Sequence, residues 1–241
     1  MKAEVGFTLA EVLITLGVIG IVAAMTLPAL VKNYQKHKIE TQLKKTYSDL
    51  ENMIKRAEVD NESFEYWDFT NSRWYDKYFQ PYLKASSCGG KNINYCFLSY
   101  GNTNDFRVFR KADGTLVDAG EGHWAVAPKY MLPDGRAILI EPIFDSSFNR
   151  NWSYLNIVVD VNGAKGPCVM GWDVFLFTLF NYERGGIKHK GLKLGSIGGG
   201  DGAYKRPSER IKKECINSGY DCGLLIQRNN WKFPTDYPIK F

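Results

Sequence analysis

One acidic side chain interrupts a long apolar stretch near the start of the chain. Its carboxylate is the first group along the chain that could form an ionic interaction. Glu11 is the only charged residue among the 25 residues from Phe7 to Val31. A carboxylate inside an apolar membrane span costs on the order of 2.5–3.5 kcal/mol at mid-bilayer and less near an interface. We therefore expect Glu11 to have a partner, and charge pairing is the chemistry that it suggests.

Five cysteines are the next distinctive residues, and they suit an oxidising compartment. Cys88 and Cys96 are eight positions apart, and Cys215 and Cys222 are seven apart, so the spacing favours two short-loop disulfides with Cys168 left over. Spacing does not fix connectivity, and other pairings stay open. A zinc site is not expected, because no Cys-x-x-Cys motif occurs and the histidines are scattered. These histidines are His37, His123 and His189.

Two glycine-containing segments are candidates for an ion site or a phosphate site. In residues 160–173, Asp160 and Asn162 precede Gly163, and oxygen ligands around a glycine suggest calcium. Only three oxygen ligands are visible where calcium takes at least six, and Asx turns explain the same residues without a metal. Residues 195–202 are glycine-rich but lack the Gly-Lys-Ser/Thr ending of a phosphate loop. We predict no metal ion and no cofactor.

No arrangement typical of an enzyme is present. The sequence has no Gly-x-Ser-x-Gly, no His-Glu-x-x-His and no dinucleotide fingerprint. The net charge is +5 on 241 residues, with 44% hydrophobic and 24% charged residues. Such a small positive net charge on a chain of this length indicates a solvated surface rather than a nucleic-acid groove. We expect neither an enzyme nor a nucleic-acid partner.

A single long helix must position Glu11. The apolar run to Val31 is long enough to cross the ~30 Å hydrocarbon core of a bilayer. It continues without glycine or proline into an amphipathic pattern with apolar residues at steps of three and four. These are Ile39, Leu43, Tyr47, Leu50, Ile54 and Ala57. The pattern predicts one helix from about Phe7 to Val59, roughly 80 Å long at ~1.5 Å per residue, whose second half packs on a globular domain.

Beyond the helix, the pattern predicts an aromatic region and then a sheet. The aromatics of residues 64–82 are interpreted as core rather than as a stacking surface, and a short helix is expected over 73–84. Apolar segments at 124–131, 136–142, 153–161 and 174–180 predict four antiparallel strands, with a hairpin turn at Asp134-Gly135. Residues 181–201 are interpreted as a surface loop. The fold class is α+β, with one face of the sheet on the helix.

The first 31 residues closely resemble the N-terminal processing signal of type IV pilins and type II secretion pseudopilins. This resemblance implies that a prepilin peptidase cuts after Gly6, that the new N-terminal Phe7 is N-methylated, and that Glu11 guides assembly by neutralising the Phe7 amine of a neighbouring subunit. Gly20 and Pro28 fall where family members have a glycine and a proline around a segment that loosens in the filament. A simple proline kink is the alternative for the isolated subunit.

The resemblance also implies a domain organisation and a location. Residues 1–6 are a leader, 7–31 a transmembrane and assembly helix, 32–59 its amphipathic continuation, and 60–241 an extracytoplasmic α+β head. The protein is expected in the bacterial cytoplasmic membrane as a single-pass protein, and then in a filament. The basic residues after the span would favour the opposite orientation under the positive-inside rule, but the cleavage signal takes precedence. They are Lys32, Lys36, His37 and Lys38.

The function implied is that of a structural subunit of a type IV pilus or a type II secretion pseudopilus. Its partners would be other pilin or pseudopilin subunits, the prepilin peptidase and N-methyltransferase, and an inner-membrane assembly platform. The second cysteine pair resembles the C-terminal disulfide loop of many pilins. The alternative is a minor pilin-like binding module, an adhesin or DNA-binding protein with exposed loops.

Overall fold

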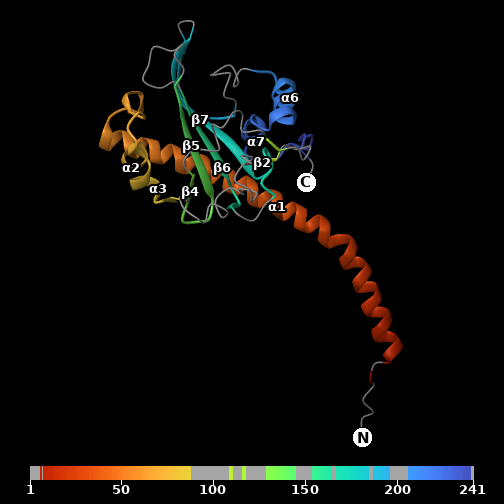
Figure 1. Cartoon of the computed structure of the whole chain (residues 1–241). Coiled ribbons are helices and arrows are strands. Elements are labelled where there is room, and N and C mark those ends of the chain that lie inside the picture. Colours follow the sequence, from red (N-terminus) through yellow and green to blue (C-terminus); the bar gives the residue numbers. More distant parts are fainter. Residues whose placement is uncertain are drawn as a thin grey trace. The chain divides into compact units, whose positions relative to one another are not determined.

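A 53-residue helix, α1 (Leu9–Asn61), is the longest element of the computed structural model (Figure 1). The structure describes residues 6, 8–87, 109–110, 116–117, 129–144, 154–163, 167–184, 187–195 and 206–239. The predicted continuous helix is confirmed, and Pro28 lies inside it. The chain divides into two compact units, Met1–Lys38 and Ile39–Phe241, so α1 contributes its first part to one unit and its second part to the other.

The second part of α1 buries one apolar stripe in the hydrophobic core of its unit. Leu43 and Ala57 are fully buried, and Leu50 is 1% exposed. Steps of three and four residues place these side chains on one face of a helix, as the sequence predicts. The predicted stripe is confirmed with two changes: Tyr47 is only partly buried, and Thr46 and Met53 join the buried set.

Three short helical segments follow α1 and bury most of the aromatic block. They are η1 (Phe64–Tyr66), α2 (Trp74–Tyr78) and α3 (Gln80–Leu83). The predicted helix over 73–84 is therefore present in two pieces, and Pro81 lies in the first turn of α3, where its missing N–H costs nothing. Trp67 and Phe79 are fully buried, and the Trp67 ring stacks on Tyr78 with centroids 4.6 Å apart. The interpretation of these aromatics as core is confirmed.

A six-stranded antiparallel sheet forms the centre of the second unit (Figure 1). Its strand order is β1-β4-β5-β6-β7-β8. The strands are β1 (Ser86–Ser87), β4 (Lys129–Met131), β5 (Ala137–Ile143), β6 (Tyr154–Asp160), β7 (Val174–Arg184) and β8 (Ile187–Leu194). A separate two-stranded sheet pairs β2 (Phe109–Arg110) with β3 (Leu116–Val117). The α+β class and the four predicted strands are confirmed.

The predicted strand count of four was too low, and the interpretation of residues 181–201 as a loop was wrong over most of its length. β7 extends to Arg184, and β8 pairs with it from Ile187 to Leu194. The β8 sequence has a glycine and three lysines, so it lacks a strong strand pattern of its own. Leu192 and Leu194 are nevertheless 6% and 0% exposed, because pairing with β7 turns them towards the core.

One face of the sheet shares a hydrophobic core with α1. Cross-strand neighbours Ile140, Ile157 and Phe177 belong to the same buried cluster as Leu43 and Leu50 of the helix. The other face of the central strands is buried as well, since Leu139, Val158 and Leu176 are at most 1% exposed. Burial on both faces explains why these strands are almost uniformly apolar.

Two C-terminal helices complete the second unit. They are α6 (Ser208–Ser218) and α7 (Cys222–Arg228). A Cβ at Gly223 would lie 2.8 Å from Leu194, so α7 packs closely on β8. The chain after α7 returns to α1, where the Trp231 ring lies 5.3 Å from that of Tyr47 and the Phe233 amide donates to Glu40 over 2.8 Å.

Candidate functional site

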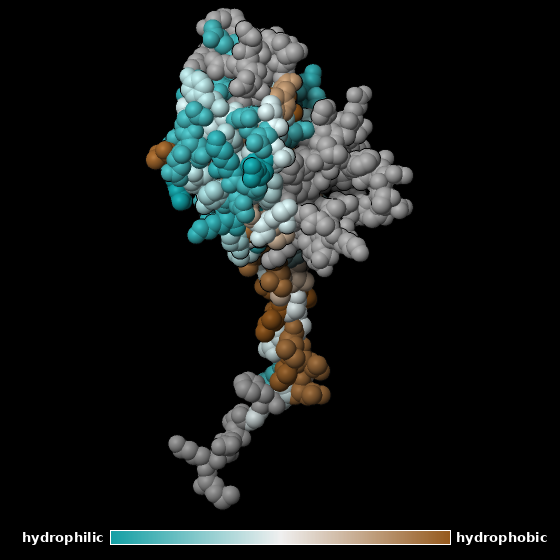
Figure 2. Space-filling view, turned by 60° about the vertical axis from the view of Figure 1, so that its left-hand side comes forward, coloured by the Kyte–Doolittle hydropathy of each residue, from teal (hydrophilic) through white to brown (hydrophobic). Residues whose placement is uncertain are grey.

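The N-terminal segment of α1 exposes apolar side chains in every direction within its own unit. Figure 2 shows this segment in brown. Leu9 is 79% exposed, Ile14 67% and Met25 75%. Among the residues described between Gly6 and Lys38, none is buried. By length and composition, α1 is the one helix in the described part of the chain that is apolar enough to cross a membrane. Such a surface is stable only in lipid or against other apolar chains.

Glu11 has a hydrogen-bonding partner within its own helix. The Thr8 backbone N–H and the Thr8 hydroxyl each donate to Glu11 Oε2 over 2.8 Å. The Glu11 N–H donates to Thr8 Oγ1 over 3.3 Å in return. This is a capping box, in which a threonine and a glutamate three residues later satisfy the free N–H groups of a helix start. The Thr-x-x-Glu spacing in the sequence is the signal for this partner, in addition to the partner expected in another subunit.

Of the other residues predicted to act in this segment, the structure describes Gly6, Gly20 and Pro28 but not Phe7. Gly6 is exposed, and Phe7 lies outside the described residues. Gly20 is inside α1 with open space where a Cβ would be. Pro28 is also helical, and near it the Thr26 hydroxyl donates to the Val22 carbonyl over 2.9 Å. The helix is continuous here, and its predicted loosening in a filament stays a prediction.

One of the two predicted disulfides is present. Cys215 and Cys222 form a disulfide that joins the last part of α6 to the start of α7. A Cβ at Gly171 would lie 2.3 Å from Cys222 Sγ, so the loop before β7 packs directly on this bridge. The predicted partners Cys88 and Cys96 lie outside the described residues. Cys168, which the pairing left over, is buried and forms no disulfide.

Asp160, at the end of β6, is buried beside that thiol. It is 1% exposed. Its Oδ1 accepts hydrogen bonds from the Asn162 N–H over 3.1 Å and from the Gly163 N–H over 2.9 Å. Its Oδ2 lies 3.5 Å from Cys168 Sγ. These contacts form an Asx turn between β6 and β7, the turn that explains these residues without a metal.

Asp173 closes the other end of the same turn. It is fully buried. Its Oδ1 accepts from the Val169 N–H over 2.7 Å, and its Oδ2 accepts from the Cys168 N–H and the Asn162 amide over 3.0 Å each. The carboxylate oxygens that calcium would need are therefore engaged by hydrogen-bond donors of the loop itself. In the described part of the chain, no group of three or more His, Cys, Asp or Glu side chains has a metal-binding arrangement. These residues do not fit the ion.

The two buried carboxyl groups differ in the donors that surround them. Burial, with a smaller contribution from Asp173, raises the pKa of Asp160 to about 8. Burial also raises the pKa of Asp173. N–H donors at both oxygens favour the ionised form of Asp173, whereas the contact described at Asp160 Oδ2 is the Cys168 thiol. A pKa of about 8 predicts that Asp160 is mostly protonated at neutral pH.

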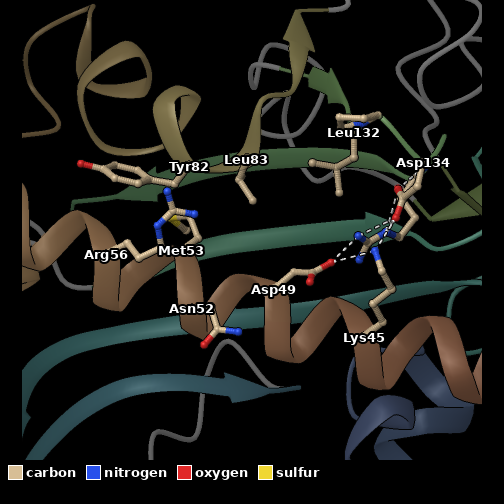
Figure 3. A pocket seen from close by; sticks show the side chains of 11 residues that line it. Lys45, Asp49, Asn52, Met53, Arg56, Tyr82, Leu83, Leu132 and Asp134 are labelled. Atoms are coloured by element: carbon tan, nitrogen blue, oxygen red, sulfur yellow. Dashed lines mark hydrogen bonds and ion pairs between the residues drawn. The ribbon is translucent and has the colours of Figure 1, made fainter.

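An ion-pair cluster fixes the β4–β5 hairpin on α1 (Figure 3). The Arg136 side chain is 4% exposed and donates to Asp134 Oδ1 over 3.0 Å, to Thr46 Oγ1 over 2.7 Å and to Asp49. Lys45 reaches Asp134 over 2.6 Å and Asp49 over 3.1 Å. Burial alone would raise the pKa of Asp134, but hydrogen bonds from Arg136 and Lys45 lower it. The cluster is structural, since its charges compensate one another.

A groove of about 430 Å³ lies beside this cluster. Met53 and Leu83 provide apolar lining, and the Arg56 guanidinium lies 5.6 Å from the centre of the Tyr82 ring (Figure 3). Sequence reasoning missed both the groove and the cluster, because residues 45–56, 82–83 and 132–136 are brought together only by the fold. The lining combines both signs of charge with apolar surface and does not specify one ligand.

No curated protein and no solved structure matches this chain. Residues 29–241 match a protein family described as a family of unknown function (DUF6613). This match begins directly after Pro28, so it includes the α+β unit but not the segment from Gly6 to Pro28 that resembles the pilin signal. Because the match covers most of the chain, the protein belongs to the DUF6613 family.

Proposed function

We propose that this protein is a structural subunit of a filament of the type IV pilus or type II secretion pseudopilus kind. It is processed after Gly6 and held in the membrane as a single-pass protein until assembly. It then polymerises through the helix from Phe7 to Val31. The observation that carries the proposal is an exposed apolar helix start that follows a Gly-Phe pair and has one carboxylate, Glu11, four residues after Phe7.

The pilin-like arrangement of the second unit supports the proposal. In pilins, the amphipathic part of a long N-terminal helix packs on an antiparallel sheet, and α1 packs in the same manner on β5, β6 and β7. The resemblance remains at the level of architecture, because the sheet here has six strands. The DUF6613 match neither adds nor removes support for assembly.

The capping box gives Glu11 a role at two stages. In the unassembled subunit, Thr8 supplies hydrogen bonds that reduce the cost of the carboxylate in the apolar segment. After cleavage, the Phe7 amine of a neighbouring subunit becomes available as a stronger, charged partner. Breaking a buried ion pair by removing one member costs roughly 3–5 kcal/mol, so such pairing would enforce one register between subunits.

Mass spectrometry of the mature chain tests processing directly. The full chain is expressed in a bacterium that has a prepilin peptidase, and an N-terminus at a methylated Phe7 is expected. A Gly6→Val variant, with a branched side chain at the cleavage position, is expected to retain residues 1–6. An intact N-terminus in the natural chain would refute processing.

Filament incorporation tests the assembly role of Glu11. The Glu11→Ala variant is expected to be processed and membrane-inserted but poorly incorporated into filaments. Thr15→Ala is a matched control, because Thr15 is also an exposed polar residue of the apolar helix and bonds only to the Val12 carbonyl in the described structure. Normal incorporation of Glu11→Ala would contradict charge pairing.

The binding-module alternative receives less support from the described residues. The alternative depends on exposed loops, with residues 185–202 and the aromatic block 64–82 as its binding segments. In that block, Trp67, Trp74 and Tyr78 are at most 8% exposed. Buried rings are not available for stacking on bases or sugars. We therefore propose the structural subunit as the function, without a nucleic-acid partner.

A further inference from the structure

Two buried carboxyl groups face the turn between β6 and β7 without a cation beside them. They are Asp160 and Asp173, which we call the carboxyl pair, and both are at most 1% exposed. In the part of the chain that the structure describes, no ion pair joins either group to a lysine, an arginine or a histidine. A buried carboxylate without a cation is costly, and a second one nearby adds repulsion. The closed turn therefore favours a pair that holds a proton.

The two carboxyl groups are held through the same neighbouring residues. The Asn162 N–H donates to Asp160 over 3.1 Å, and the Asn162 side-chain amide donates to Asp173 over 3.0 Å. Likewise, the Cys168 thiol lies 3.5 Å from Asp160 Oδ2, while the Cys168 N–H donates to Asp173 over 3.0 Å. A change of charge on one carboxyl group therefore acts on the contacts of both.

Residues 167–171, which we call the latch segment, connect the carboxyl pair to the C-terminal helices. At one end, two N–H groups of the segment donate to Asp173. At the other end, a Cβ at Gly171 would lie 2.3 Å from Cys222 Sγ. The Tyr237 hydroxyl donates to the Gly171 carbonyl. The hydrogen bonds to Asp173 thus hold the segment against the disulfide and the C-terminal chain.

The closed latch segment is strained at one residue. Cys168 has a φ of 57°, in the left-handed region that a residue with a Cβ adopts only at a cost. Its N–H bond to Asp173 keeps it there. Gly171 has a φ of 82°, which glycine adopts without that cost. Losing the hydrogen bonds to Asp173 therefore relieves strain at Cys168, and Gly171 can absorb the change of direction.

We propose that the carboxyl pair is a proton-operated latch. While the pair holds a proton, the latch segment stays bonded to Asp173 and closed on the disulfide between Cys215 and Cys222. When the pair loses that proton, two negative charges are buried together, and the segment opens so that water reaches them. The proposal concerns the α+β unit and does not depend on membrane insertion or filament assembly.

The charges of the β4–β5 hairpin do not compensate the pair. This hairpin packs on the turn, since a Cβ at Gly163 would lie 2.0 Å from the Gly135 carbonyl oxygen. Its charged side chains, Asp134 and Arg136, form an ion pair with each other over 2.8 Å and belong to the cluster on α1. The hairpin therefore adds no uncompensated charge to the turn.

The other elements around the turn contribute no titrating charge either. Ala137 and Val174, the cross-strand neighbours at the end of β6, have no titratable side chain. Before α7, Asp221 forms an ion pair with Arg206 over 3.5 Å. Burial raises the pKa of Tyr237 well above its usual value, so its hydroxyl stays protonated. The carboxyl pair is therefore the group that responds to pH in this turn.

Amide hydrogen exchange of the full-length protein in a neutral detergent tests the latch. The amides of Cys168, Val169 and Gly171 are followed between pH 5 and pH 8.5 by residue-resolved mass spectrometry. Each rate is divided by the intrinsic rate at that pH to give a protection factor. The Ile157 amide is the reference, because it lies in the central strand β6 and exchanges when the sheet itself opens.

The three latch amides are expected to exchange faster than Ile157 at every pH, because the segment opens without the sheet. An opening that releases one proton is favoured by up to about tenfold per pH unit between the pKa values of the closed and open states. Burial raises the pKa of Asp160 from 3.8 to about 8. The protection of the latch amides should therefore fall on the order of 100-fold from pH 5 to pH 8.5. Exchange at the rate of Ile157, or protection that is independent of pH, would overturn the proposal.

A pair of variants separates the latch from other effects of pH. Asp160→Asn removes the titrating group and is expected to abolish the fall in protection. The control Asp68→Asn changes an exposed aspartate that also accepts from a turn, at the Thr70 N–H over 2.8 Å, and should keep the fall. An equal fall in Asp160→Asn, or its loss in Asp68→Asn, contradicts the latch. If Asp160→Asn does not fold, the natural chain still decides, because both faster exchange than Ile157 and the fall with pH are required of it.

Discussion

The buried carboxyl group of Asp160 makes the stability of the α+β unit depend on pH. Burial raises the pKa of Asp160 from 3.8 to about 8 in the folded protein. Between these values the folded chain keeps a proton that the unfolded chain has released. Raising the pH therefore favours unfolding, and stability that is present below about pH 4 is lost as the pH approaches 8.

The magnitude follows from the same shift. One pKa unit corresponds to about 1.4 kcal/mol, so a rise of roughly four units sets an upper limit of about 6 kcal/mol on the stability lost across this range. Coupling to Asp173 and relaxation of the turn reduce this value, and we expect a loss of about 2–4 kcal/mol between pH 5 and pH 8.5. Urea unfolding of the full-length protein in a neutral detergent, followed by tryptophan fluorescence, measures it.

Replacing Asp160 by asparagine isolates the effect. In Asp160→Asn the amide oxygen still accepts from the Asn162 and Gly163 N–H groups, and the amide nitrogen faces Cys168 without a titrating proton. At pH 5, the free energy of unfolding of the variant is expected to be equal to or lower than that of the natural chain. Between pH 5 and pH 8.5, the variant is expected to lose about 2–4 kcal/mol less of this free energy than the natural chain.

The matched variant Asp173→Asn is expected to lose stability because of its hydrogen bonds. Both oxygens of Asp173 accept N–H donors, so an amide nitrogen there would face another donor. A loss of about 1–3 kcal/mol is expected at neutral pH. If stability falls equally with pH in the natural chain and in Asp160→Asn, the assignment of the proton to Asp160 is refuted.

Three further predictions concern other contacts. Arg136→Ala removes the buried cation from two carboxylates that are about one-third exposed and still have Lys45, so it should lower the free energy of unfolding by about 1–3 kcal/mol, against under 1 kcal/mol for exposed Lys45→Ala. Equal losses in urea unfolding would contradict this. Thr8→Val should weaken the start of α1 by about 1 kcal/mol, seen as faster hydrogen exchange over residues 9–14, whereas Thr8→Ser keeps protection. Cys215→Ser should cost about 2–3 kcal/mol, and unchanged urea unfolding would exclude a stabilising bridge.

The resemblance to pilins and the DUF6613 match concern different parts of the chain. The first depends on residues up to Val31, and the second begins at Ala29. The motif therefore carries the proposal of processing and assembly, while the family match covers the α+β unit. The two segments are connected without a break, because α1 runs as one helix from the pilin-like segment into the segment matched by the family.

Local patterns in the sequence were sufficient for several features. The helix and its buried stripe followed from side chains at steps of three and four, and the hairpin at Asp134 followed from its Asp-Gly pair. The disulfide between Cys215 and Cys222 followed from short spacing, because nearby cysteines meet at little entropic cost. In each case the residues that determine the feature are close together in the chain.

Other features were decided only by the tertiary structure, because their partners lie far apart in the sequence. β8 has a weak pattern of its own and becomes a strand by pairing with β7. Arg136 meets Asp49 across 87 positions. The sequence by itself determined that Glu11 lies in an apolar helix, and that Asp160 and Asp173 flank one loop. Burial decided that the pKa of Asp160 is raised, since the pKa of a carboxyl group depends on the solvent and charges that folding places around it.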